Sequence, residues 1–299
     1  MADGKQQPMD PVRAYLDYFR DMGVYDFYRN GEPGTFEPVR VEAQPEPVVE
    51  VAAARIAVEQ APAVERPTGV VAQPIAAAAA SASLVDMAKI VSLTELAPSH
   101  GVRVASGDKA AALEGIRNEI GDCTRCPLAY AGRHTIVFGD GDPNARLMFV
   151  GEGPGADEDE QGLPFVGKSG QLLNNMIVAM GLSREQVYIA NIVKCRPPGN
   201  RAPEPVEANT CTQFLARQMD VVQPEVVVAL GATAATYLLG VKQSLAGLRG
   251  RWHSCRGAKL AVTYHPAFLL RDPRMKGEAW KDLQRVMAEL GLKAPAKGT

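Results

Sequence analysis

The sequence is poor in cysteine and aromatic residues, and it has no long apolar run. Its five cysteines are an odd number, and the first nine residues, which include Asp3 and Lys5, contain no apolar segment typical of a secretory signal. The longest apolar stretch, the alanines around Ala76, is interrupted by serines and is too weakly hydrophobic to cross a membrane. We therefore expect a cytoplasmic protein with no membrane contact, whose cysteines are metal ligands or buried thiols rather than disulfides.

The chain also lacks a net charge of one sign, since it has 32 basic and 34 acidic residues, but the charges are unevenly distributed. Residues 1–108 hold 9 basic and 15 acidic residues, whereas residues 242–299 hold 12 basic and 4 acidic residues. A basic excess of this kind is typical of surfaces that bind phosphate. On charge alone, a solvated helix face explains it equally well.

Leucine and aromatic residues are absent between Val41 and Ser83, where 32 of 43 residues are Ala, Pro, Val or Glu. Such a segment cannot bury enough surface to offset its ordering entropy, which predicts a linker. Ahead of it, apolar residues from Val12 to Met22 recur at helical spacing. We expect a short amphipathic helix and tail in residues 1–35 that docks on the main domain or binds a protein partner, a flexible linker in 36–108, and a folded domain in 109–299.

Within 109–299, short apolar runs alternate with helical patterns. This alternation predicts an α/β fold, a three-layer α/β/α sandwich around a mainly parallel sheet, preceded by a largely disordered N-terminal extension. Strands are expected at Thr135–Phe138, Leu147–Val150, Val187–Ala190, Val226–Leu230 and Leu260–Thr263, and helices at Ala111–Ile120, Ser169–Met180, Val206–Val222, Thr233–Leu239 and Glu278–Leu290. In such sheets, binding sites form at the carboxyl ends of the strands.

A glycine-rich loop, Gly151–Gly155, directly follows one predicted strand and would allow the backbone to approach a ligand closely. Its glycine spacing fits neither a dinucleotide fingerprint nor a P-loop, and no helix is expected to open immediately after it. Further along, Phe165 lies in a loop between Pro164 and Gly167 and is poorly placed for a core. Its ring either stacks on a ligand or packs beneath its own loop.

Four cysteines have a spacing that suits metal ligation: Cys123 and Cys126 are separated by two residues, and Cys195 and Cys211 follow far along the chain. Four thiolates suit either a tetrahedral zinc ion or an iron–sulfur cluster, and the spacing does not choose between them. Some of the four could instead be ordinary buried thiols. Cys255 is expected to remain unligated.

Two polar residues stand at the predicted carboxyl ends of other strands. Asn191 follows the strand that ends at Ala190, and His265 follows the strand that ends at Thr263. Either residue alone is more often structural than functional. Because both share an edge with the Gly151 loop, we expect one site there.

Three stretches, residues 151–173, 191–198 and 265–271, together resemble the family 4 uracil-DNA glycosylases. The resemblance covers roughly Cys123 to Leu290. It implies an α/β/α sandwich that removes uracil from DNA and leaves an abasic site, with uracil-containing DNA as its partner. It also implies that Cys123, Cys126, Cys195 and Cys211 hold a [4Fe-4S] cluster, a choice that the spacing alone does not make.

The chemistry of uracil excision assigns roles to three of the residues already named. Phe165 would stack on the flipped base, and Asn191 would match the polar edge of uracil while mismatching that of cytosine. His265 would donate a hydrogen bond to O2 of the leaving base, where negative charge develops.

In the family 1 enzymes, an aspartate positions the attacking water. The matching position in this sequence is Gly153, so the carboxylate expected there is missing. Glu152 and Glu158 are the carboxylates nearby. The resemblance associates Glu158 with shaping the pocket together with Asn200. We expect a structural role for Glu158, with water positioning as a further possible role.

Two alternatives remain. A relative of the family X type would bind uracil-DNA covalently through a histidine in a basic insertion after the third cysteine region, and no such insertion is evident. A non-enzymatic iron–sulfur module that binds DNA would need the basic C-terminal region but neither Phe165 nor Asn191 at strand ends. In each case we expect a monomer in the cytoplasm, at the nucleoid when bound to DNA.

Overall fold

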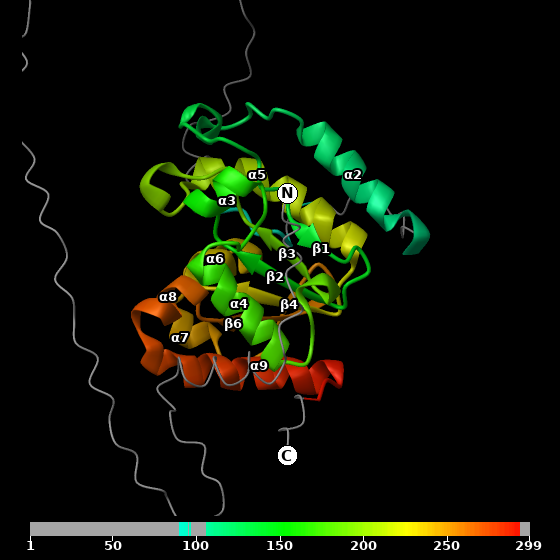
Figure 1. Ribbon diagram of the computed structural model, residues 1–299, viewed down its shortest axis with the longest axis vertical. Coiled ribbons are helices and arrows are strands. Elements are labelled where there is room, and N and C mark those ends of the chain that lie inside the picture. The colour runs from blue at the N-terminus through cyan, green and yellow to red at the C-terminus, as the bar shows by residue number, and fades with distance from the viewer. Residues whose placement is uncertain (1–89, 95, 97–105, 294–299) are drawn as a thin grey trace, which may run out of the picture. The chain divides into compact units, whose positions relative to one another are not determined.

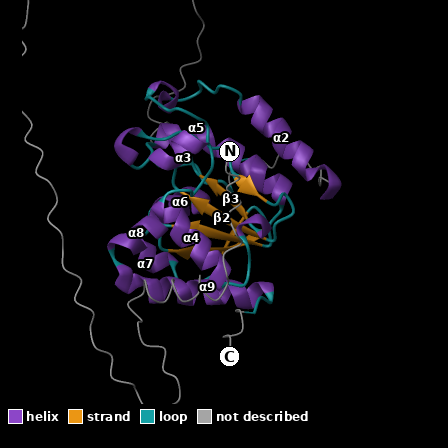
Figure 2. Ribbon diagram, viewed as in Figure 1, coloured by secondary structure: helices purple, strands orange, loops and turns teal. Residues whose placement is uncertain are grey.

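The computed structural model describes residues 90–94, 96 and 106–293 (Figure 1). The helix predicted at Val12–Met22, the linker at 41–83 and the boundary near residue 35 lie outside the described residues and stay predictions. The described part of the chain forms helices on both sides of one sheet (Figure 2).

The sheet has six strands in the order β1-β3-β2-β4-β6-β5. The four central strands are parallel to one another, whereas β1 and β5 are antiparallel and form the edges. This arrangement confirms the predicted α/β fold with a mainly parallel sheet. The strand bounds are β1 Asp140–Gly141, β2 Leu147–Gly151, β3 Tyr188–Asn191, β4 Val226–Leu230, β5 His253–Cys255 and β6 Ala258–Thr263.

Helices cover both faces of the sheet, which is why the central strands are apolar on both faces. In β2, Met148 and Val150 face a hydrophobic cluster with α2, α5 and α6, whereas Leu147 and Phe149 face a second cluster with α4 and α9. Among the described residues, no helix is both long and apolar enough to span a membrane. The helix bounds are α2 Lys109–Ile120, α3 Ala156–Gln161, α4 Lys168–Ala179, α5 Pro205–Val222, α6 Ala232–Leu239, α7 Leu245–Leu248, α8 Pro266–Arg271 and α9 Lys276–Leu290.

The strand predicted at Thr135–Phe138 is wrong, because the chain there is irregular and enters the sheet only at Asp140. The buried carboxylate of Asp159 accepts the backbone N–H of Thr135, and the N–H of Val137 donates to the Lys194 carbonyl. These bonds satisfy the backbone of an apolar segment without a strand partner.

The expectation that no helix opens after the glycine-rich loop is also wrong. Gly155 is the N-cap residue of α3, and Glu158 reaches back to accept the Gly155 N–H at 3.0 Å. This capping arrangement starts a short helix in a sequence with little hydrophobic periodicity, which explains why the pattern did not predict it.

Residues 90–94 and 96 belong to the predicted linker, yet they pack against the folded domain. The side chain of Leu93 is fully buried, and its N–H donates to the Tyr237 carbonyl at 3.1 Å. Arg256, ion-paired with Asp220, donates to the carbonyls of Leu93 and Leu96 at 2.9 Å each. This part of the linker is therefore attached to the domain, and its packing argues for a boundary earlier than residue 109.

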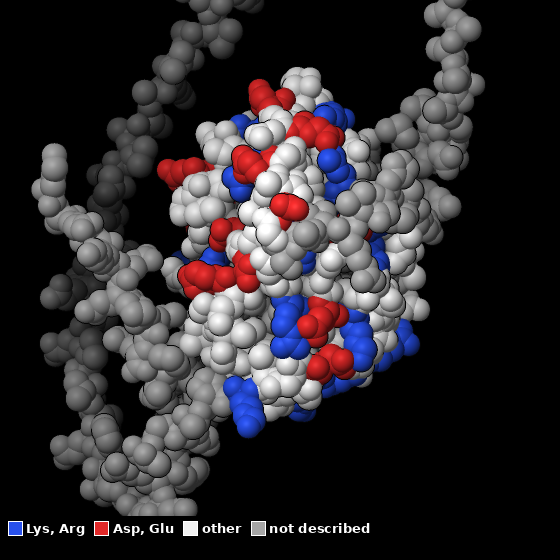
Figure 3. All heavy atoms as spheres, turned by 90° about the vertical axis from the view of Figure 1, so that its right-hand side faces the viewer, with Lys and Arg blue, Asp and Glu red and all other residues white. Residues whose placement is uncertain are grey.

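Five of the twelve basic residues in 242–299 form ion pairs with carboxylates in the part of the chain that the structure describes. Figure 3 shows Lys and Arg interleaved with Asp and Glu on the face in view, rather than a patch of one sign. A solvated, ion-paired surface therefore explains part of this charge. The pairs are Arg249–Asp282, Arg256–Asp220, Lys259–Glu289, Arg274–Asp272 and Lys281–Glu278.

Candidate active site

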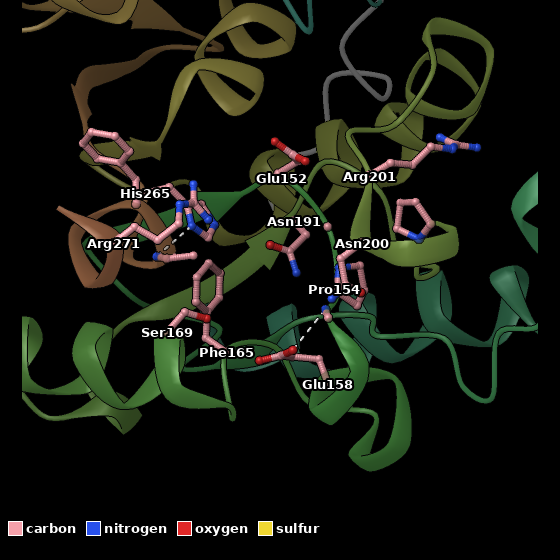
Figure 4. A pocket seen from close by; sticks show the side chains of 15 residues that line it. Glu152, Pro154, Glu158, Phe165, Ser169, Asn191, Asn200, Arg201, His265 and Arg271 are labelled. Carbon is pink, nitrogen blue, oxygen red and sulfur yellow. Dashed lines mark hydrogen bonds between the residues drawn. The ribbon is translucent and has the colours of Figure 1, made fainter. Parts of the chain in front are cut away.

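A cavity of about 400 Å³ opens at the carboxyl ends of β2, β3 and β6 (Figure 4). We call it the strand-end cavity. The structure thus brings together the residues that the sequence placed at one edge of the sheet, and α3, α4 and α8 add side chains around it. Its lining includes Glu152, Gly153, Pro154, Gly155, Glu158, Phe165, Ser169, Asn191, Asn200, Arg201, His265 and Arg271.

Asn191, the last residue of β3, is 1% exposed, and its Oδ1 atom has no hydrogen-bond partner in the described protein. A Cβ atom at Gly151, on the neighbouring strand, would overlap this oxygen and lie 2.6 Å from Cζ of Phe165. Only glycine therefore lets both side chains approach the end of β2. A buried carbonyl oxygen without a partner costs about 1–3 kcal/mol, so the arrangement suits a ligand that donates a hydrogen bond.

His265 is held in one orientation at the start of α8. Its Nδ1 atom accepts the backbone N–H of Ala267 at 3.1 Å, which leaves Nε2 to carry the proton and donate. Burial, helped by the charge of Arg271, lowers the pKa of His265 to about 4, against an opposing effect of Glu158. The imidazole is therefore neutral at pH 7 and still has one N–H to offer.

Phe165 has a left-handed backbone, with φ 54°, which costs a bulky residue about 1–3 kcal/mol. The residue is 4% exposed, and its ring centroid lies 5.6 Å from that of His265 at an interplanar angle of 33°. The ring lines the strand-end cavity and also belongs to the hydrophobic cluster beneath α4 and α9. The expectation that Phe165 is poorly placed for a core is therefore wrong, because the side chain is buried in this cluster as well as bordering the cavity.

The two carboxylates predicted near the site differ in their surroundings. Both oxygens of Glu158 accept backbone N–H groups, from Gly155, Val166 and Gly167, each at 3.0 Å. Glu158 thus ties two walls of the cavity together. Glu152 also lines the cavity, but its carboxylate forms no hydrogen bond or ion pair with any residue that the structure describes. In Figure 4, Asn191 lies between the two carboxylates.

Gly153 and Asn200 border the same cavity. Gly153 contributes backbone alone. Asn200, with φ 55°, accepts a hydrogen bond from Nε of Arg196 at 2.7 Å through its Oδ1 atom. Asn200 and Glu158 therefore line the same cavity without a hydrogen bond between them, since their side chains bond different partners.

A buried lysine beneath the site was missed by the sequence reasoning. Nζ of Lys194 donates to the backbone carbonyl of Asn191 at 3.1 Å and to Oε1 of Gln218 at 2.6 Å. Burial lowers the pKa of Lys194 to about 8, against an opposing effect of Cys211. The available signal was a lysine four residues after a predicted strand, directly behind the apolar pair Ile192 and Val193.

The four cysteines named from their spacing line one small cavity together with Ile120, Ile136, Lys194, Thr210 and Phe214. We call it the cysteine cavity. Within the described ranges, no three Cys, His, Asp or Glu side chains converge closely enough to hold a single metal ion. Cys255 lies elsewhere, in β5, where its thiol donates to the Leu238 carbonyl at 3.5 Å.

N–H groups point at three of the four sulfur atoms. Arg125 donates to Sγ of Cys123 and Arg133 to Sγ of Cys195, each at 3.4 Å, and the backbone N–H of Lys194 donates to Sγ of Cys211 at 3.3 Å. These donors fit thiolates better than thiols.

Burial opposes that charged form. It raises the pKa of Cys126 and Cys195, and it raises that of Cys211 to about 12. A positive group bound among the four sulfurs would offset this cost.

An α/β sandwich with this cavity at its strand ends matches a known class of protein. The family model of the Uracil DNA glycosylase superfamily matches residues 138–284, which include the strand-end cavity. The type-4 uracil-DNA glycosylase of Thermotoga maritima is 44% identical over 162 residues, covering 54% of this chain and 84% of that protein. The type-4 enzyme of Archaeoglobus fulgidus is 37% identical, covering 61% of this chain and 96% of its own.

A type-5 uracil-DNA glycosylase of Pyrobaculum aerophilum is 30% identical over 208 residues, covering 58% of this chain and 92% of that protein. The type-4 relatives therefore match with higher identity than this type-5 relative. The chain belongs to the type-4 uracil-DNA glycosylase family.

Proposed function

We propose that the protein removes uracil from DNA by hydrolysing its N-glycosidic bond, which releases free uracil and leaves an abasic site. The observation that carries this proposal is the buried, unpartnered oxygen of Asn191, in one cavity with an aromatic ring and a neutral histidine. A glycosylase must take its base out of the helix at a cost of a few kcal/mol and then bind it in such a pocket.

Recognition is assigned to Asn191 and Phe165. Uracil offers an N3–H donor beside the O4 acceptor, so the Asn191 amide can accept from N3 through Oδ1 and donate to O4 through Nδ2. Cytosine presents the reversed pattern and would leave buried groups unpaired, which makes discrimination steep. Stacking on Phe165 contributes about 1–3 kcal/mol, by analogy with other contacts between bases and aromatic side chains.

Bond cleavage is assigned to His265. As the bond between C1′ and N1 breaks, its electron pair moves onto the uracil ring, and charge develops at O2. The Nε2–H of a neutral imidazole strengthens its hydrogen bond to O2 as that charge grows. Since Nδ1 already accepts from Ala267, the donor is aimed before the reaction begins.

The water that adds to C1′ must lose a proton and be oriented by a carboxylate or by backbone. Of the two carboxylates that line the cavity, Glu152 is the one that bonds no described residue, so we assign it this role, with the backbone of Gly153 beside it. Glu158, whose oxygens already accept three N–H groups, shapes the pocket. Asn200 lines the same pocket and shapes it together with Glu158.

We further propose that Cys123, Cys126, Cys195 and Cys211 hold a [4Fe-4S] cluster. The shared cavity, the N–H donors to sulfur and the lack of convergence on one point suit a group with several metal atoms better than a zinc ion. When bound, the cluster would crosslink three separate segments of the chain. A cytoplasmic location at the nucleoid, a monomeric state and a protein partner for residues 1–35 remain predictions.

A covalent uracil-DNA-binding protein of the family X type would need a histidine in the segment between Cys195 and Cys211, and that segment contains none. A DNA-binding module without activity would not need a cavity that orients His265 and Asn191.

Incubation with an oligonucleotide that contains one uracil distinguishes the glycosylase from these two alternatives. Many equivalents of free uracil and an alkali-labile site are expected, whereas a one-to-one adduct or binding without release would overturn the proposal. Asn191→Asp should lose this activity, and the same oligonucleotide with thymine in place of uracil is the control.

A further inference from the structure

Arg184, which the sequence did not single out, bonds several groups next to the strand-end cavity. It starts the short 3₁₀ helix Arg184–Gln186 before β3, and its side chain is 19% exposed. The guanidinium donates to the carbonyls of Pro164 at 2.6 Å and Phe165 at 3.2 Å. It also donates to Oδ1 of Asn174 at 3.1 Å and to Oδ2 of Asp140 at 3.3 Å. Two of these acceptors belong to the loop that carries the stacking ring.

The first turn of α4 also packs against the Phe165 carbonyl. A Cβ atom at Gly170 would overlap the carbonyl group of Phe165, so the helix backbone lies directly against it. Just beyond, Glu158 accepts the N–H groups of Val166 and Gly167. The loop is thus held by a cation at the carbonyls before Val166 and by an anion at the amides that follow.

These contacts hold Phe165 in a backbone conformation that a bulky side chain rarely adopts, with φ 54°. A residue in a left-handed conformation persists only when its surroundings over-determine it. Relaxation of the loop would turn the ring away from its position beside His265 and the end of β2. Arg184 lies outside the cavity lining, so it acts on a bound base through the groups it bonds, two of which are the carbonyls of this loop.

We propose that Arg184 is a positioning residue that holds Phe165 in the strained conformation in which its ring can stack on a flipped base. This inference rests on the proposed function, since it specifies how the base-stacking ring is held. Asp140, at the sheet edge, orients the guanidinium. A lysine could not replace the arginine, because a single ammonium lacks the planar fork that reaches both carbonyls and the carboxylate together.

A double-mutant cycle on the full-length protein tests the proposal. The variants are Arg184→Met, Phe165→Ala and their combination, and the probe is an oligonucleotide with 2-aminopurine beside uracil, whose fluorescence reports base flipping. Arg184→Met should weaken the flipped complex on the order of tenfold, the range expected for loss of one stacking contact. In the Phe165→Ala background the same change should have less than about a twofold effect, because the group it positions is gone.

Arg256→Met is the matched control, since Arg256 also bonds two carbonyls and an aspartate but lies away from the cavity. It should lower the melting temperature and leave the flipping signal of the folded protein unchanged. Arg184→Lys should behave like Arg184→Met rather than like the wild type. Should Arg184→Met fail to fold, Asp140→Asn gives the same test, with a loss of about threefold that the Phe165→Ala background removes.

Equal losses from Arg184→Met with and without Phe165 would overturn the inference, since a merely structural residue acts independently of the ring. The same holds if Arg184→Lys retains the full flipping signal. If the wild-type protein neither flips nor cleaves uracil, the proposed function itself fails. If it does both and the cycle is additive, only the role of Arg184 fails.

Discussion

The strand-end cavity and the cysteine cavity are connected through Lys194, which lines the second and bonds the Asn191 carbonyl of the first, and they are built in opposite ways. In the strand-end cavity, hydrogen bonds within the chain already orient the key groups. The Ala267 N–H orients His265, and Glu158 holds the loops at Gly155 and Val166. In the cysteine cavity, the thiols share a space without converging, and burial raises the pKa of Cys211 to about 12.

This difference follows from how long each site holds its ligand. A pocket for a transient substrate must keep its shape when empty, so its orienting contacts come from the protein. The empty pocket then leaves a buried atom such as Oδ1 of Asn191 without a hydrogen bond, which is unfavourable. A site for a resident metal group is shaped by the group itself, since binding contributes directly to folding.

The largest expected effect is at the cysteine cavity. Cys211→Ser should abolish iron binding and unfold the domain, because the metal-binding free energy lost is comparable to a domain's whole stability of about 5–15 kcal/mol. Cys255→Ser is the matched control, because that thiol is buried but lies outside the cavity. Iron content and the visible absorbance of protein purified without oxygen measure both variants. Stoichiometric zinc in fresh wild-type protein, with no iron, would contradict the cluster.

At the strand-end cavity, His265→Ala should lower the single-turnover rate by a factor on the order of 10² to 10³, the range for removing one preorganised donor. Affinity for uracil-DNA should change little, because the bond strengthens only as charge develops. Phe165→Ala provides the contrast, since loss of stacking should weaken binding as well as turnover. Wild-type cleavage by His265→Ala would place the stabilisation of the leaving group elsewhere.

A smaller effect concerns the packed end of the predicted linker. Deleting residues 1–88 should leave activity and stability nearly unchanged, because the motifs and Leu93 remain. Deleting residues 1–105 should cost about 2–5 kcal/mol, the range for emptying the site of a buried leucine. Urea unfolding of both proteins, with Leu93→Ala in the shorter deletion as a reference, measures this. Equal stability of the two deletions would show that the segment's packing contributes nothing.

The smallest effect is the pH dependence of His265. Because the folded pKa is about 4 and the ordinary value is 6.5, the unfolded chain binds a proton that the folded protein does not bind between these values. His265 therefore does not lower the free energy of unfolding above pH 6.5. As the pH falls from 6.5 toward 4, protonation of the unfolded chain lowers the free energy of unfolding. The single-turnover rate should be flat from pH 6 to 8. A rate that falls as the pH rises through 6.5 would show that a cationic imidazole acts instead.

Much of the fold could be predicted because the central strands are buried on both faces and read as continuous apolar runs. Val226–Leu230 was placed at its observed bounds, and the four longer helices shifted by only a residue or two. Thr135–Phe138 failed because its apolar residues pack without a strand partner, and α3 was missed because a capping carboxylate, rather than a hydrophobic period, starts it.

The sequence alone determined which chemical groups are present and on which strand ends they stand, since strand direction and apolar pattern are local properties. It could not determine which of them are free to act. Glu152 and Glu158 are alike in sequence, and only the three backbone N–H groups around Glu158 distinguish them. The neutral state of His265 and the strained backbone of Phe165 arise from burial and from distant partners such as Arg184. Electrostatic and steric terms of this kind depend on distances that exist only once the chain has folded.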